Sequence, residues 1–220
     1  MKIVSALLTS AVFASAVTSA QPVNTPAPTA GVKAFLDVLN SSGGKPMEQM
    51  SPEEARQVLI GAQQGAVLPP AQVSDKTIQV KGLSIKLKIV KPENVKGTLP
   101  VFMFFHGGGW VLGDFPTHER LIRYLVRESG AAAVYVDYTP SPESHFPIAI
   151  NQAYEATKWV AENGKEIGVD GTRLGLVGNS VGGNMVASVA LQAKQFNGPK
   201  ISYNVMLWPV TDANFDNESY

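Results

Sequence analysis

The sequence of 220 residues contains no cysteine, which excludes disulfide bonds and thiolate metal sites. It also lacks a surplus of either charge, because 18 Lys and Arg balance 18 Asp and Glu, and no basic run occurs. This balance argues against nucleic acid as a partner. The three histidines lack the spacing of metal ligands, and neither a Gly-Lys-Ser/Thr phosphate loop nor a G-x-G-x-x-G dinucleotide turn is present. We therefore expect no metal and no cofactor.

Long hydrophobic runs are also missing, apart from residues 3–17, which follow Met1-Lys2 and precede Thr18-Ser19-Ala20. These are the three parts of a secretory signal peptide, and the run is too short to span a bilayer comfortably. The alternative is a buried first helix. We expect a signal peptide at residues 1–20, a Pro-rich mobile lead at 21–30, a secreted or periplasmic location, and no stable membrane anchor after signal removal.

The remainder, with 45% hydrophobic residues overall, is long enough for one globular domain with a real core. Alternating apolar residues predict a hairpin with one buried and one solvent-exposed face, which turns near Lys81-Gly82. Later apolar runs lack alternation, as expected for strands covered by helices on both faces, and amphipathic segments separate them. Strand–helix alternation predicts an α/β fold with a mostly parallel twisted sheet and right-handed crossovers. The expected strands are 77–80, 83–90, 101–105, 131–138, 174–178 and 203–208, with helices at 117–129 and 148–163.

Two short helices are expected ahead of the sheet. The first carries apolar residues at helical spacing (Val32, Phe35, Leu36 and Leu39) and ends at Gly43-Gly44. The second opens on the capping box of residues 51–54 and runs to about residue 60. Such helices can form a cap over a pocket, but ordinary packing helices give the same periodicity.

One serine lies between a short apolar strand and an amphipathic helix, in the pattern Gly178-x-Ser180-x-Gly182. A sharp strand-to-helix turn brings neighbouring backbones so close that side chains at the two glycine positions would collide with them. The same turn displays the serine hydroxyl at a helix N-terminus, where negative charge is favoured. Ser180 is therefore the candidate catalytic nucleophile, with Gly178 and Gly182 as its structural support.

About seventy residues upstream, another apolar strand ends in His106-Gly107-Gly108-Gly109. Three successive glycines leave backbone amides uncovered and able to converge on a developing oxyanion. The alternative is a flexible glycine turn. Together with the amide of Val181, which follows the serine, Gly107, Gly108 and Gly109 form the expected oxyanion hole.

These motifs resemble the hormone-sensitive-lipase-like (family IV) carboxylesterases of the α/β-hydrolase fold. The similarity rests on residues 106–114, 136–138, 142–143, 146–147 and 178–183, and covers nearly all of the chain after residue 30. It implies a cap at residues 31–72, a partial hydrolase core at 73–220, and a small-molecule substrate, an ester of short-to-medium acyl length. Asn179 and Val181 stand where the family usually has Asp and Ala, and residues 139–141 replace its usual Arg-Leu-Ala.

Several other residues are candidates for supporting roles. We expect His106 to hold the shape of the glycine loop, and the resemblance implies that Glu143 braces the loops of the site. Trp110 and Phe115 are candidate pocket residues, with core packing as the alternative. His118 is expected to be solvated in the first turn of a helix, and His145 to lie at the surface or the pocket rim.

The sequence has no histidine after Ser180, and its only later acids are Asp212, Asp216 and Glu218. In α/β-hydrolases the acid and the histidine follow the serine, and serine needs that base to become nucleophilic. We therefore expect an amino-terminal fragment of a longer hydrolase, inactive by itself and with an unpaired edge on its last strand. The alternative is a non-catalytic pseudo-hydrolase that binds a small ligand. A peptidase on the same scaffold is a subordinate possibility.

Overall fold

The computed structural model describes residues 27–41, 43–214 and 216. Helix α1 (Ala30–Ser41) belongs to a first compact unit, residues 1–45, and the second unit comprises residues 46–220. The predicted signal peptide lies outside the described residues, as does most of the predicted lead. The two helices expected to form one cap thus fall in different units, because helix α2 (Pro52–Gly61) belongs to the second.

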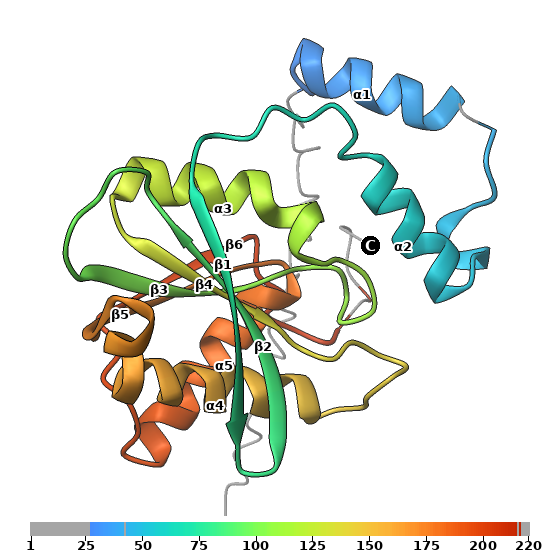
Figure 1. Cartoon of the computed structure of the whole chain (residues 1–220). Coiled ribbons are helices and arrows are strands. Elements are labelled where there is room, and N and C mark those ends of the chain that lie inside the picture. The colour runs from blue at the N-terminus through green and yellow to red at the C-terminus, as the bar shows by residue number, and fades with distance from the viewer. Residues whose placement is uncertain (1–26, 42, 215, 217–220) are drawn as a thin grey trace, which may run out of the picture. The chain divides into compact units, whose positions relative to one another are not determined.

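The second unit alternates strands and helices along most of its length (Figure 1). Each helix that was predicted from periodicity is present, and α4 has the predicted bounds. After the short helix η1 (Met47–Gln49) and α2, the elements are β1 (Gln72–Val80), β2 (Leu83–Lys91), β3 (Leu99–Phe105), α3 (Phe115–Ser129), β4 (Ala132–Asp137), α4 (Ile148–Asn163), η2 (Gly164–Ile167), β5 (Val169–Asn179), α5 (Val181–Gln195) and β6 (Tyr203–Leu207).

The six strands form one sheet in the order β1-β2-β4-β3-β5-β6. Strands β1, β2 and β4 pair antiparallel, whereas β4, β3, β5 and β6 pair parallel. The predicted hairpin turns at Lys81 and Gly82, both with positive φ (49° and 78°), which is the geometry of a tight two-residue turn. The order of the parallel strands places the carboxyl ends of β3 and β5 side by side, so the two candidate motifs meet there.

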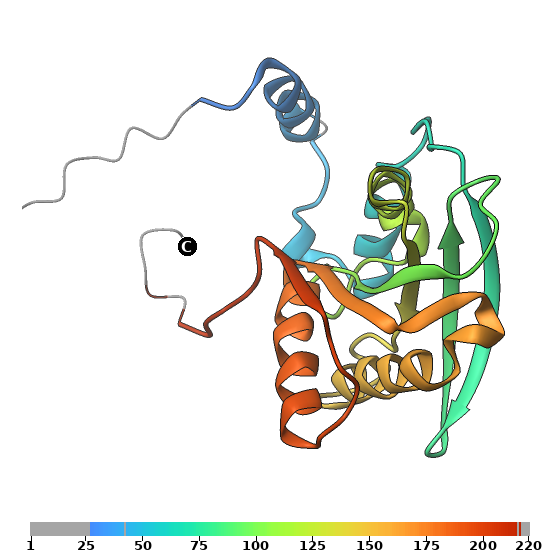
Figure 2. The same ribbon diagram turned by 90° about the vertical axis from the view of Figure 1, so that its left-hand side faces the viewer.

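Helices cover both faces of the sheet, with α3 on one face and α4 and α5 on the other (Figures 1 and 2). Alternate residues of β3 serve the two layers: Phe102 and Phe104 pack with α3, whereas Met103 and Phe105 pack with α4 and α5. All four are buried. Burial on both faces explains the continuous apolar runs and holds the strand that leads into the glycine loop in one register.

Helix boundaries follow from local capping. Ser51 and Glu54 form the predicted capping box at the start of α2. Helix α3 begins two residues earlier than predicted, because Asp114 caps it: its carboxylate accepts from the Thr117 amide, and the Thr117 hydroxyl pairs with the Asp114 amide. Gly130 ends the helix with a φ of 68°, a conformation that glycine adopts without strain.

The prediction that the strand at 203–208 is covered on both faces is wrong for this structure. Tyr203, Val205 and Met206 of β6 are 43%, 38% and 45% exposed. Within the described residues, β6 pairs only with β5 and is therefore an edge strand. The sequence of β6 resembles that of the buried strands, so its composition could not reveal the exposure.

Candidate active site

Ser180 connects β5 directly to α5 in a strained backbone conformation, with φ 55° and ψ −123°. Such angles are rare for residues other than glycine and persist only where surrounding structure enforces them. A Cβ at Gly178 would collide with the carbonyl of Gly182, and one at Gly182 with the carbonyl of Phe105. The turn is therefore as tight as the glycine spacing predicts, and Ser180 is half-buried rather than packed in the core.

The peptide groups on either side of the Ser180 side chain are held by the end of β6, by the segment that follows it and by the first turn of α5. The Ser180 amide donates to the Leu207 carbonyl at 2.9 Å, and the Ser180 carbonyl accepts from the Val210 amide at 3.2 Å and the Gly183 amide at 2.9 Å. The Ser180 hydroxyl has no hydrogen-bond partner among the residues that the structure describes. Its backbone is fixed while its oxygen remains available.

The glycine loop lies beside this serine. A Cβ built on Gly107 would lie 3.1 Å from the Cβ of Ser180. Gly108 has a φ of 122°, and its carbonyl accepts from the amides of Val111 and Leu112 at 3.0 and 2.8 Å. Within the described part of the chain, the amides of Gly108 and Gly109 donate to no other group. Val181 is the first residue of α5, so its amide has no acceptor within the helix.

Gly107 differs from the other expected oxyanion donors. Its amide donates to the side-chain oxygen of Asn179 at 3.1 Å. The amide is therefore already in use, and Gly107 does not fit the donor role expected from the sequence. The glycine is still required sterically, because a Cβ there would lie 2.7 Å from the Asn179 side-chain nitrogen.

His106 is buried beneath the loop. Its ring stacks on Tyr138 with centroids 4.2 Å apart, and its Nδ1 lies 2.8 Å from the Gly107 carbonyl. The Tyr138 hydroxyl donates to the His106 carbonyl at 3.0 Å. Burial lowers the pKa of His106 to about 3, so the ring is neutral near pH 7 and unsuited to accept a proton. This geometry agrees with the expectation that His106 shapes the loop.

The expectation that His118 is solvated is wrong. Its ring is largely enclosed, lies 5.4 Å from the His106 ring, and contacts Asn179 through Nε2 at 3.3 Å. Burial lowers the pKa of His118, and the Asp114 carbonyl opposes that shift through a hydrogen bond. The first turn of a surface helix suggested solvent, but the sequence does not show that this turn packs against the end of β5. His145, by contrast, is exposed at the rim of a cavity, as expected.

Arg56 of α2 was missed by the sequence analysis. It forms a bidentate ion pair with Glu143, at 2.6 and 2.9 Å, and its Nε donates to the Val111 carbonyl at 2.8 Å. A further bond reaches the Ser141 carbonyl at 3.0 Å. The guanidinium lowers the pKa of Glu143 to about 2, chiefly through the side-chain hydrogen bond. Arg56 and Glu143 thus tie α2 to the loop after the three glycines, which suits the bracing role expected for Glu143.

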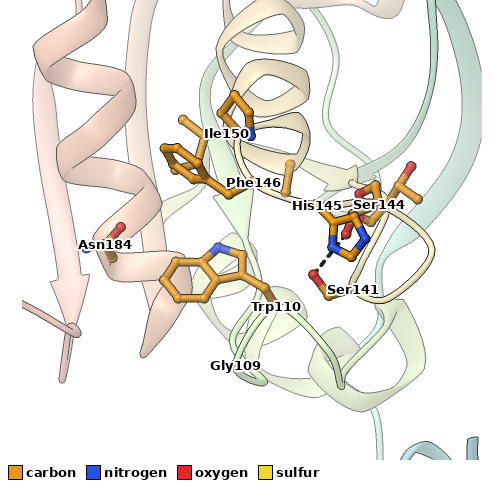
Figure 3. A pocket seen from close by; sticks show the side chains of 11 residues that line it. Gly109, Trp110, Ser141, Ser144, His145, Phe146, Ile150 and Asn184 are labelled. Carbon is orange, nitrogen blue, oxygen red and sulfur yellow. Dashed lines mark hydrogen bonds between the residues drawn. The ribbon is translucent and has the colours of Figure 1, made fainter. Parts of the chain in front are cut away.

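A cavity of about 260 Å³ opens beside Gly109 (Figure 3). The Trp110 indole forms one wall and faces Phe146 and Ile150, while Asn184 of α5 borders another side. Across Gly108 and Gly109 lies a second hollow, which includes Met47 and Met50. Its other lining residues are Pro52, Ala55, Val111 and Leu112.

Of the two expected pocket residues, only Trp110 lines this cavity. Phe115 is buried in the layer under α3, where it meets Tyr135 edge-on with centroids 5.3 Å apart. It was expected near the pocket because it follows the glycine loop closely in sequence. The turn at residues 109–114 instead points it to the opposite face of the sheet.

Residues 27–41, 43–214 and 216, which the structure describes, show neither a metal-binding cluster nor a membrane-spanning helix. They contain no group of three or more His, Cys, Asp or Glu side chains arranged to hold a metal ion. None of their helices is both long and apolar enough to cross a membrane.

Comparison with known proteins agrees with this geometry. A model of the alpha/beta hydrolase fold matches residues 102–220, more than half of the chain. The chain therefore belongs to the alpha/beta hydrolase fold family, and its resemblance to the hormone-sensitive-lipase-like branch is confirmed.

Several relatives and solved structures are named as esterases. Carboxylesterase NlhH of Mycobacterium tuberculosis is 34% identical over 155 residues, which cover 70% of this chain and 49% of the relative. A thermostable esterase from Pseudomonas putida ECU1011 is 65% identical with a TM-score of 0.83, covering 85% of this chain and 59% of that one. A hyperthermophilic esterase from Pyrobaculum calidifontis is 31% identical with a TM-score of 0.79, covering 87% of this chain and 62% of that one. The chain spans about half the length of the curated relatives it matches.

Proposed function

We propose that this chain provides the nucleophile and the oxyanion hole of a serine carboxylesterase for esters of short-to-medium acyl length. The observation that carries the proposal is the strained Ser180, whose hydroxyl has no described partner and lies beside a glycine loop with uncommitted amides. Relatives named carboxylesterase and esterase support the reaction class. The cavity beside Gly109 is the proposed site for one part of the ester.

In the proposed reaction, the Ser180 oxygen attacks the ester carbonyl carbon as its proton passes to a histidine base. The carbonyl oxygen becomes negatively charged and accepts hydrogen bonds from the amides of Gly108, Gly109 and Val181. The intermediate collapses to an acyl-serine, and the histidine returns the proton to the leaving alcohol. Water, activated by the same base, then releases the acid and regenerates the serine.

The base and its acid partner are absent from the expected positions in these 220 residues, because no histidine follows Ser180. His106 and His118 are both neutral and bonded within the loop scaffold, and His145 is exposed. Asp212 bonds to the amides of Ala213 and Asn214 in its own turn. We therefore propose that residues 1–220 alone do not turn over esters, and that the reaction needs a histidine and a carboxylate from outside them.

The test compares two proteins: residues 1–220, and the product of the natural gene that includes them. Each is exposed to a fluorophosphonate, which labels an activated serine, and to p-nitrophenyl butyrate. We expect labelling at Ser180 and hydrolysis only in a product that supplies the histidine, and loss of both in Ser180→Ala. Hydrolysis by the Ser180→Ala variant at the parent rate would refute the assignment.

A non-catalytic pseudo-hydrolase is the second candidate, favoured by the same lack of a histidine after Ser180. It predicts that the gene product binds an ester or its acid without consuming it, whatever follows residue 220. Calorimetric binding with no label and no turnover would support this candidate over the esterase.

We also propose that the protein is exported, from the signal-peptide pattern of residues 1–20. Mass spectrometry of the protein recovered from a bacterial periplasm tests this. The periplasmic protein should begin at Gln21, whereas a protein that keeps Met1 and is found only in the cytoplasm would contradict export.

A further inference from the structure

The side chain of Asn179, the last residue of β5, bridges the glycine loop and a histidine. Its Oδ1 accepts from the Gly107 amide at 3.1 Å, and its Nδ2 lies 3.3 Å from Nε2 of His118. The bridge has little room to move, because a Cβ at Gly107 would lie 2.7 Å from the Asn179 Nδ2. Each end of this amide therefore faces a particular partner: the oxygen faces a donor, and the nitrogen faces a ring nitrogen.

The protonation of the His118 ring follows from its other nitrogen. Nδ1 lies 3.2 Å from the Asp114 carbonyl oxygen, which can only accept, and 2.9 Å from the Thr117 hydroxyl oxygen. The Thr117 hydroxyl donates its one proton to the same Asp114 carbonyl at 2.8 Å. Nδ1 must therefore carry a hydrogen, which leaves Nε2 of the neutral ring free to accept from the amide of Asn179.

We infer that neutral His118, in its Nδ1–H form, is a positioning residue that orients Asn179 and thereby holds Gly107 and the oxyanion loop against Ser180. Protonation of His118 would place an N–H opposite the NH2 group of Asn179. The amide would then have to turn its oxygen toward the imidazolium, and Gly107 would lose its acceptor. This inference rests on the proposed function only for its effect on catalysis, not for the hydrogen-bond arrangement.

The surroundings of His118 favour the neutral ring on balance. The end of β3 contributes the neutral ring of His106, at 5.4 Å, and the apolar ring of Phe104, at 6.1 Å. Burial is the largest influence on the pKa of His118 and lowers it, while Asp114 raises it. The titratable and charged groups placed around this ring are His106, which follows β3, Asp114, which caps α3, and Tyr135 and Tyr138, which stack with His106. Glu53 and Arg56 of α2 border the groove beside Asp114.

An aspartate at position 179 reverses this preference. A carboxylate accepts from the Gly107 amide as asparagine does, but it has no hydrogen to give to Nε2. It instead stabilises the imidazolium, and an opposite charge at this distance raises a pKa by about one to three pH units. Asn179→Asp therefore keeps the Gly107 bond while removing its dependence on neutral His118.

The experiment is a histidine-detected ¹⁵N–¹H NMR titration of residues 1–220 between pH 8 and pH 5. With three histidines in the sequence, His118→Gln and His145→Gln variants assign the ring signals. We expect the Nδ1–H tautomer for His118 in the parent, and a Gly107 amide shift that moves as His118 takes up its proton. In Asn179→Asp the His118 pKa should rise, and the Gly107 shift should no longer report a lost bond.

Two results would overturn the inference: an Nε2–H tautomer in the parent, or a Gly107 amide that ignores His118 protonation. Both are read from the spectra of the parent once its ring signals are assigned, so neither depends on the folding of the Asn179→Asp variant. The effect on catalysis is measured in the gene product that includes these residues. There kcat should fall as His118 protonates, whereas in Asn179→Asp the protonation of His118 should no longer lower kcat. A gene product with no esterase activity would refute the proposed function and leave the NMR result standing.

Discussion

Replacing Gly108 by alanine should be far more damaging than the same change at Gly109, although both glycines have positive φ. At Gly108, φ is 122° and the new Cβ would collide with the Leu112 carbonyl. At Gly109, φ is 63° and nothing lies within 4 Å of the new Cβ. Gly109→Ala therefore costs about 1–2 kcal/mol of left-handed strain, whereas Gly108→Ala must displace the loop itself.

The expected magnitude follows from the donors that the loop would lose. Removing one oxyanion donor typically lowers kcat by roughly 100- to 1000-fold, and Gly108→Ala should fall at least that far with little change in KM. Gly109→Ala keeps its amide in place, and we expect a loss of less than about tenfold, or 1.4 kcal/mol. Steady-state hydrolysis of p-nitrophenyl butyrate by the gene product measures both.

Thermal unfolding provides the control for that comparison. Gly130→Ala, at the end of α3, has a φ of 68° and an open Cβ position, so it measures left-handed strain far from the loop. All three variants should remain folded. Equal kcat values for the Gly108 and Gly109 variants would refute the reasoning that the Leu112 collision displaces an oxyanion donor.

Three further outcomes can be measured directly. Arg56→Lys keeps a charge but loses the guanidinium fork, so kcat/KM should fall about tenfold while Glu143→Gln, which retains an acceptor, falls less. Because burial lowers the pKa of His106 from 6.5 to about 3, the unfolded protein binds a proton that the native protein excludes. The free energy of unfolding, measured in urea, should therefore keep its full value above pH 6.5 and fall towards pH 3 by up to about 1.4 kcal/mol per pH unit. The slope should be shallower in His106→Gln. Asp114→Ala removes the cap of α3 and should lower the free energy of unfolding by about 1 kcal/mol; an unchanged urea midpoint would contradict that role.

Sequence periodicity predicted most of the elements because their causes are local. The Lys81-Gly82 turn, the capping box of α2 and the bounds of α4 each depend on a few neighbouring residues. The strand-to-helix turn at Ser180 was predictable for the same reason, since its glycine spacing is imposed by backbone contact. Even so, α3 begins two residues before its predicted start, because the prediction did not include Asp114 as its cap.

Several of the remaining differences depend on contacts between distant segments. The amide of Gly107 is occupied by Asn179, 72 residues away, and Arg56 reaches Glu143 across 87 residues. His118 is enclosed only because α3 packs beside the end of β5. Nothing in the local pattern around these residues distinguishes a free amide from a bonded one, or a surface histidine from a buried one.

Leu207 and Val210 hydrogen-bond to the peptide groups of Ser180, so the strand-to-helix turn is not the only support of the nucleophile. Hydrogen bonds with Leu207, the last residue of the adjacent strand β6, and with Val210, which follows it, add to those that α5 makes with Ser180. The backbone conformation that displays the serine hydroxyl therefore depends in part on the neighbouring strand. Damage to that outer strand would loosen the nucleophile and would also reach the neighbouring cavity, because the side chain of Asn184, which lines it, donates to the Val210 carbonyl at 3.0 Å.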